Sequence, residues 1–208
     1  LALRSKDIET TVDCYRKVLE ANPLNREILI KLATIIQTYF PENTEEAIDC
    51  YERLLEFKID TAQIYYELGH LYMSKEDKLN SVSAFKLAVD HDPENPFFNN
   101  SLGYAYAKAE LYDDAIEHYQ KAISINPDAE WTSIVCQALG SIYAEQKGNI
   151  EAAVSTYQAG IILDPKNYDL YIALGDIHMA DYDLDKAIRS YCDAITLNPE
   201  DYRAYSKV

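Results

Sequence analysis

The sequence repeats itself about every 34 residues, and this period limits the folds open to the chain more than any other feature. A proline closes most of the intervals: Pro23, Pro93, Pro127, Pro165 and Pro199. Ile59 stands where one further proline is expected, and the successive spacings are 36, 34, 34, 38 and 34 residues. A constant period of this length is the sequence signature of a solenoid or another repeat architecture.

The same motifs return inside each interval. A Leu-Gly pair recurs with Gly69, Gly103, Gly140 and Gly175, and Ala33 takes the glycine's place in the first copy. A later segment places an alanine four residues before an aromatic residue, as in AIEHY, AVSTY and AIRSY. Apolar residues at helical spacing predict two amphipathic helices of about 12 to 14 residues, joined by a short polar turn. Each unit is therefore predicted to be a helical hairpin.

The recurring glycines need a structural reason, because glycine inside a helix costs about 1 kcal/mol relative to alanine. Close approach of the partner helix supplies that reason. The second-helix aromatics are expected to fill the space between successive hairpins: Tyr51, Phe85, Tyr119, Tyr157 and Tyr191.

These motifs resemble the tetratricopeptide repeat family, and the resemblance covers essentially all 208 residues. It implies an all-α fold, a right-handed superhelical solenoid of stacked antiparallel helix hairpins, with the first helices lining a concave groove. We expect one solenoid domain over residues 1–208, in which a second helix of a truncated repeat comes first and the start of a further helix comes last. The expected units are 1–25, 26–61, 62–95, 96–129, 130–167, 168–201 and 202–208.

The unit that ends at Pro165 is four residues longer than the period. Its extra residues are assigned to the segments DAEWTS, residues 128–133, and QKGN, around Gly148. We expect a longer helix here that carries Trp131, whose side chain either packs in the core or makes an exposed contact.

Composition excludes several classes of protein. A formal net charge of −16 disfavours binding to nucleic acid and to anionic membrane surfaces. No apolar stretch is long enough for a membrane helix, and the first ten residues are too polar for a signal peptide. The chain begins with Leu1, so we expect a fragment whose true N-terminus is not visible, and a cytoplasmic location.

The motifs for catalysis and metal binding are missing from the sequence. The spacing of the four cysteines does not match that of metal ligands. We expect them to be small buried or half-buried apolar residues in a reducing compartment. The six glycines are taken up by helix contacts and one turn, which leaves none for a phosphate loop. We therefore expect no enzymatic activity, no cofactor and no metal.

The family resemblance identifies the groove positions on the first helices. The middle of the expected groove is apolar and aromatic and its later part is acidic, which predicts a partner peptide or helix with an apolar anchor and basic residues. The expected peptide-binding residues are Tyr66, His70, Met73, Phe97, Asn100, Tyr104, Glu145, Asp169, Ile172 and Asp176.

Several co-chaperones of this family hold an acidic C-terminus with a clamp of lysine, asparagine and arginine. At the corresponding sites this chain has Ile30, Tyr66, Asn100 and Gln137. Binding of an acidic chaperone tail is therefore disfavoured.

The predicted function is a non-catalytic scaffold for protein–protein interaction. Two alternatives stay open at this point. The chain could self-assemble through uncapped solenoid ends, or it could be the substrate-docking arm of a larger enzyme whose catalytic domain lies outside this fragment.

Overall fold

The computed structural model describes residues 2–58, 61–127 and 131–207. Ile59 and residues 128–130 of the predicted insertion lie outside the described residues. The described residues form helices, turns and short connections and no strand. The chain divides into two compact units, unit 1 (Leu1–Ala105) and unit 2 (Tyr106–Val208), and each is described separately.

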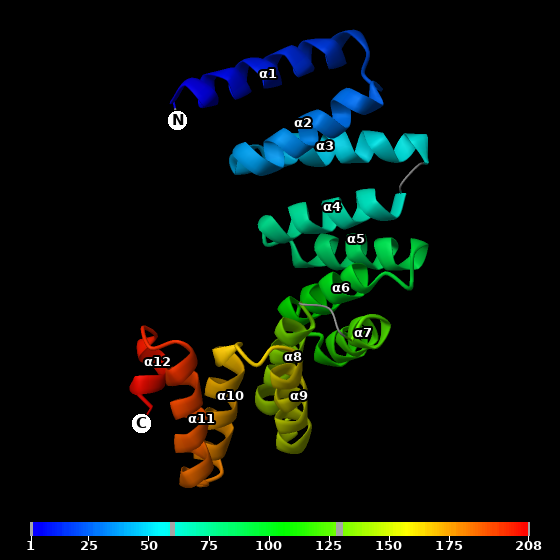
Figure 1. Cartoon of the computed structure of the whole chain (residues 1–208). Helices are drawn as coiled ribbons and strands as arrows, with labels where there is room; N and C mark the ends of the chain where they lie inside the picture. Colours follow the sequence, from blue (N-terminus) through cyan, green and yellow to red (C-terminus); the bar gives the residue numbers. More distant parts are fainter. Residues whose placement is uncertain (1, 59–60, 128–130, 208) are drawn as a thin grey trace. The chain divides into compact units, whose positions relative to one another are not determined.

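Unit 1 consists of helices α1 to α6, and α6 runs across its boundary. Their bounds are α1 Ala2–Ala21, α2 Arg26–Tyr39, α3 Thr44–Leu54, α4 Thr61–Ser74, α5 Lys78–His91 and α6 Pro96–Lys108. Short 3₁₀ turns at Pro41–Asn43 and Leu55–Phe57 flank α3. Helix α2 packs against α3, and α4 packs against α5, as two hairpins (Figure 1). Helix α3 also contacts α4, so successive hairpins stack.

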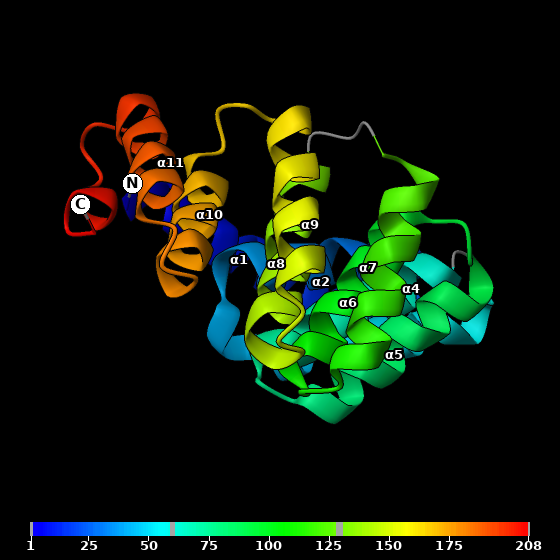
Figure 2. The same ribbon diagram turned by 90° about the horizontal axis from the view of Figure 1, so that it is seen from below.

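Unit 2 continues the same pattern. Its helices are α7 Tyr112–Ile125, α8 Thr132–Ser141, α9 Ile150–Leu163, α10 Tyr168–Ala180, α11 Leu184–Leu197 and α12 Tyr202–Tyr205. Helices α8 and α9 lie side by side, as do α10 and α11 (Figures 1 and 2). The predicted fold class, an all-α solenoid of stacked helix hairpins, is confirmed.

The hairpin turns are built from two backbone devices. A residue with positive φ ends the first helix: Glu76, Glu110, Gly148 or Tyr182. The following residue caps the second helix in three hairpins, where the Asp77, Asn149 and Asp183 side chains accept a hydrogen bond from the backbone N–H three residues later. A left-handed residue followed by an N-cap reverses the chain within two residues.

The Leu-Gly glycines make room for an aromatic ring of their own hairpin. A Cβ atom on Gly69 would lie 2.6 Å from the Phe85 ring, and one on Gly175 would lie 2.4 Å from the Tyr191 ring. The close approach predicted from the sequence is therefore made by a side chain of the second helix. That these aromatics fill the space between successive hairpins stays a prediction, and Tyr191 shares a buried cluster with Ala204 of the following helix α12.

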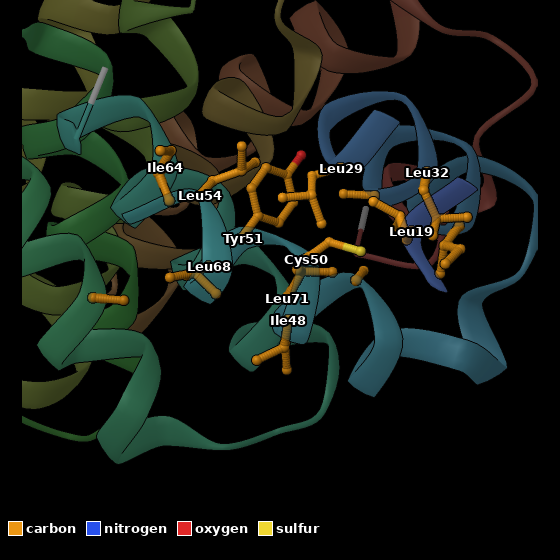
Figure 3. Packing of buried hydrophobic residues seen from close by; sticks show 14 of the residues in the cluster. Leu19, Leu29, Leu32, Ile48, Cys50, Tyr51, Leu54, Ile64, Leu68 and Leu71 are labelled. Atoms are coloured by element: carbon orange, nitrogen blue, oxygen red, sulfur yellow. The ribbon is translucent and has the colours of Figure 1, made fainter. Parts of the chain in front are cut away.

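Buried apolar side chains from α2, α3 and α4 form the core of unit 1. Leu29, Leu32, Tyr51 and Leu54 belong to this cluster, and Ile64 from α4 joins it (Figure 3). Because α3 contributes to the α2 interface and to the α4 interface, its side chains hold two hairpins together.

The repeat that ends at Pro165 accommodates one of its extra residues in a π-helical turn. Ile142–Gln146 is π-helical, and the Asn149 N–H bonds to the Tyr143 carbonyl at 2.8 Å. The equivalent bond in the next hairpin, from Asp183 to His178, spans one residue fewer. The expected helix carrying Trp131 is wrong, because α8 begins at Thr132, after Trp131. Trp131 packs, partly buried, against a core cluster of unit 2.

Candidate functional site

One hollow of unit 1 is lined by residues of α2, α3, α4 and α6 and of the connection between α5 and α6. It is a pocket of about 530 Å³ that is open to solvent. Its apolar wall includes Ile30, Leu54, Ile64 and Phe98. A groove with an apolar wall and a few polar groups is the usual form of a peptide or ligand site.

The Glu67 carboxylate lies in the polar part of this pocket. Glu67 lies half-buried on α4, and each of its oxygens accepts a hydrogen bond from an amide. The Gln63 Nε2 donates to one oxygen at 2.7 Å, and the Gln37 Nε2 donates to the other at 3.4 Å. The two amides orient the carboxylate without neutralising its charge.

The amide of Gln37 is itself fixed from the core. The Tyr51 hydroxyl donates to the Gln37 Oε1 at 3.0 Å. Burial raises the pKa of Tyr51, and the negative charge of Glu67 raises it further, so the hydroxyl stays protonated and remains a donor. A chain of hydrogen bonds therefore runs from α3 through α2 to Glu67 on α4.

Four aromatic rings gather beside the pocket. Tyr66 lies edge-on to His70 with 4.5 Å between ring centroids, and 5.0 Å from the buried Phe98. Phe85 lies 5.0 Å from His70. Burial lowers the pKa of His70, which favours the neutral imidazole among these rings.

The remaining groove residues predicted on unit 1 differ in exposure. Phe97 is 52% exposed and Tyr104 is 45% exposed. Asn100 and Met73 are half-buried. Phe97 and Tyr104 lie on α6 seven residues apart, which places both on one helix face.

In unit 2, two of the predicted acidic groove residues have basic partners. Asp169 pairs with Arg203 at 2.7 Å, and Asp176 pairs with Lys207 at 2.7 Å. The Tyr191 hydroxyl also donates to Asp176, at 2.7 Å. These two carboxylates are therefore neutralised by residues of the same chain.

The other two predicted residues of unit 2 differ from each other. Ile172 is only 9% exposed and packs with Ala187 and Tyr191, so it belongs to the core. Glu145 is exposed on the π-helical turn, and no basic side chain pairs with it among the residues that the structure describes.

The second-helix tyrosines reach from the hairpin interior to the groove. The Tyr157 hydroxyl lies 3.1 Å from the Ser141 hydroxyl, and the Tyr191 hydroxyl bonds to Asp176. Tyr51 instead donates to Gln37, which lies three residues beyond Thr34, the position equivalent to Ser141 and Asp176. The Tyr157 and Tyr191 rings pass the glycine of the first helix, and each hydroxyl contacts the side chain of the residue that follows this glycine.

Two further properties of the described residues bear on function. Within residues 2–58, 61–127 and 131–207, no group of three or more His, Cys, Asp or Glu side chains could hold a metal ion. Over the same residues, no helix is long and apolar enough to cross a membrane.

Four residues that line the pocket are absent from the expected peptide-binding residues, although the repeat register places them at first-helix groove positions. They are Ile30, Thr34, Gln63 and Glu67. The available signal was the pair Gln63 and Glu67, which lie four residues apart on one helix face.

Models of the tetratricopeptide repeat match four stretches of the chain. They are described as "Tetratricopeptide repeat" for residues 62–95, 99–129 and 141–202, and as "TPR repeat" for residues 42–75.

Curated relatives show the same likeness. The chain is 30% identical over 126 residues to the general transcriptional corepressor ssn6 of Schizosaccharomyces pombe, covering 60% of this chain and 11% of that protein. It is 25% identical over 172 residues to anaphase-promoting complex subunit 3 of the same organism, covering 83% of this chain and 25% of the relative. The chain thus spans a quarter or less of these two relatives.

A solved structure has the same fold. The TPR protein YrrB, whose structure is described as having an unusual peptide-binding site, aligns with a TM-score of 0.73 and 23% identity. The alignment covers 94% of this chain and 97% of YrrB. Together with the four matching repeat models and the stacked hairpins, these likenesses establish that the chain belongs to the tetratricopeptide repeat family.

Proposed function

We propose that the chain is a non-catalytic scaffold for protein interaction, and that the unit 1 pocket holds a peptide segment or helix of a partner by an apolar anchor. The pocket carries this proposal, because Ile30, Ile64 and Phe98 form an apolar wall beside solvent. Apolar and aromatic side chains buried in such pockets supply most of the energy of an interface.

Two exposed aromatic residues lie on α6, the helix that contributes Phe98 to the pocket. Phe97 and Tyr104 on α6 offer rings to a bound segment. Tyrosine and phenylalanine are common interface residues because they bury much area with little loss of side-chain freedom.

The relatives support the general part of the proposal, that the chain is a scaffold for protein interaction. One is named as a subunit of the anaphase-promoting complex, and one solved TPR protein is described as having a peptide-binding site. The first description names a member of a complex, and the second names a site that binds a peptide.

Site-specific photocrosslinking tests the location. A benzoylphenylalanine at Ile30 should crosslink a partner segment that the protein captures. The matched control places the same group at Leu79, which is 82% exposed on α5 of the same unit and does not line the pocket. Equal crosslinking at both positions would contradict the proposal.

A pair of substitutions tests the contribution of the aromatics. Phe97→Ala with Tyr104→Ala should weaken partner capture at least tenfold, which corresponds to about 1.4 kcal/mol. A melting curve of the double variant checks that the fold is retained. Unchanged capture by a folded double variant would remove these two rings from the site.

A further inference from the structure

An apolar anchor in the unit 1 pocket would contact the apolar wall and would form no hydrogen bond or ion pair with the Glu67 carboxylate. This carboxylate lies half-buried in a pocket whose wall includes Ile30, Ile64 and Phe98. Both oxygens accept amide hydrogen bonds, from Gln37 and from Gln63. Among the described residues, none with a positive charge pairs with it.

The amides around Glu67 leave it able to bind a cation. Each carboxylate oxygen has two acceptor positions, so one position on each oxygen remains after Gln37 and Gln63 are counted. Hydrogen bonds between a cation and a carboxylate are stronger than those between neutral groups. An oriented, half-buried carboxylate therefore gains more from a cation than a fully solvated one does.

The charge of the whole pocket points the same way. Its lining contains two carboxylates, Glu67 and Asp92, and one cation, Arg26. Asp92 accepts a hydrogen bond from the Asn95 amide. The chain as a whole carries a net charge of −16, which attracts cationic segments over longer distances.

We infer that Glu67 binds the ammonium or guanidinium group of a lysine or arginine in the partner segment, beside the apolar anchor that contacts Ile30, Ile64 and Phe98. This inference rests on the proposed function. Lysine and arginine suit the pocket because each carries an apolar stem and a charged head. The stem can lie along the apolar wall while the head reaches the carboxylate.

Selection from a library of random dodecapeptides displayed on phage tests this inference with the full chain as bait. The selected peptides should share an apolar residue with a lysine or arginine at one constant spacing. A selected lysine peptide should bind the Glu67→Gln variant about tenfold more weakly than the wild type, because the amide keeps the shape and loses the charge. The same peptide with norleucine in place of lysine should bind both proteins equally.

Two further variants complete the design. Glu67→Lys should reverse the preference and select aspartate or glutamate at the same spacing. Glu151→Gln is the matched control, since it makes the same change at an exposed glutamate on the second helix α9 of unit 2, away from the expected peptide-binding residues. It should leave selection and affinity unchanged.

The outcomes separate this inference from the proposed function. Peptides that share an apolar anchor but no basic residue, or a lysine preference that survives Glu67→Gln, would overturn the inference alone. The proposed function fails, and the inference with it, if no peptide is enriched or if Ile30→Ser leaves the affinity of the selected peptides unchanged. Melting curves of all variants confirm that each is folded.

Discussion

Acidic residues of the first helices face different surroundings in the two units. In unit 1, Glu67 meets the side-chain amides of Gln37 and Gln63. In unit 2, Asp169 and Asp176 meet Arg203 and Lys207. Arg203 and Lys207 come 34 and 31 residues after their partners, about one repeat later. The charge that a groove offers is therefore decided by the neighbouring repeat as well as by the helix that carries the acid.

This difference matters more for binding than for stability. Partly exposed ion pairs such as Arg203 with Asp169 contribute about 0–1 kcal/mol to folding. The same pair removes one negative charge from the surface that a partner would meet. Similar acidic residues therefore predict different ligands in the two units.

The largest expected effect tests whether the units share one core design. Phe85→Ala in unit 1 and Tyr191→Ala in unit 2 should each lower the free energy of unfolding by about 3–5 kcal/mol, since both rings are buried. Urea denaturation measures both. Ile162→Ala, at a side chain on α9 that is 79% exposed, is the control and should change stability by about 0.5 kcal/mol or less. A clear inequality between the two buried sites would show that the cores differ as well as the grooves.

The glycines give the next test of the shared design. Gly69→Ala and Gly175→Ala should each cost about 1–3 kcal/mol, because the new methyl group would meet the Phe85 or Tyr191 ring. At Gly148 the space is open, and the cost of Gly148→Ala comes from its φ of +62°, about 1 kcal/mol. Thermal unfolding compares the three variants. A Gly69 or Gly175 variant as stable as the wild type would contradict the ring contact.

Removal of single tyrosine hydroxyl groups tests whether units 1 and 2 differ in peptide binding. Tyr51→Phe and Tyr191→Phe should each cost about 1 kcal/mol of stability, since each loses one hydrogen bond. Only Tyr51→Phe should also weaken the binding of a lysine peptide, because Gln37 is then no longer held toward Glu67. Calorimetric titration measures the binding. Wild-type affinity of the Tyr191→Phe variant would support a binding site in unit 1 alone. Equally weak binding by both variants would contradict this difference between the units.

The smallest expected effect concerns the end of unit 2 at low pH. Hydrogen bonds from Arg203 lower the pKa of Asp201, so this contribution is present above the unfolded pKa of about 4. It is lost as the pH falls through the lower, folded pKa. Hydrogen exchange at the buried Ala204 should therefore accelerate below pH 4, beyond the intrinsic change.

The control for this measurement is Arg203→Gln, which removes the guanidinium that lowers the Asp201 pKa. Its exchange at Ala204 should depend less on pH than that of the wild type. An identical pH dependence in the two proteins would show that Arg203 does not hold α12 in place.

The repeat motifs predict the hairpins well, because each motif acts through contacts inside one unit. Leu-Gly, the second-helix aromatic and the capping Asp or Asn mark the helix contact and the turn. The location of the extra residue was harder to predict, because the π-helical turn Ile142–Gln146 depends on backbone hydrogen bonds that leave no mark in the sequence.

The candidate site is harder to predict from the sequence for a different reason. Glu67 depends on Gln37, which lies 30 residues away, and the availability of Asp169 depends on Arg203. Such pairs join neighbouring repeats and vary from copy to copy, so a repeat consensus does not contain them. Self-association and a place within a larger enzyme remain predictions.

The reach of the second-helix ring from the hairpin interior to the groove has a consequence for how new binding preferences arise. Tyr51 and Phe85 occupy equivalent interior positions and differ by one oxygen atom. With tyrosine, the groove side chain in front is fixed by a hydrogen bond, whereas with phenylalanine the neighbour is the ring of His70. An exchange between tyrosine and phenylalanine at this buried position can change how firmly the neighbouring surface side chain is held, while every exposed residue stays the same.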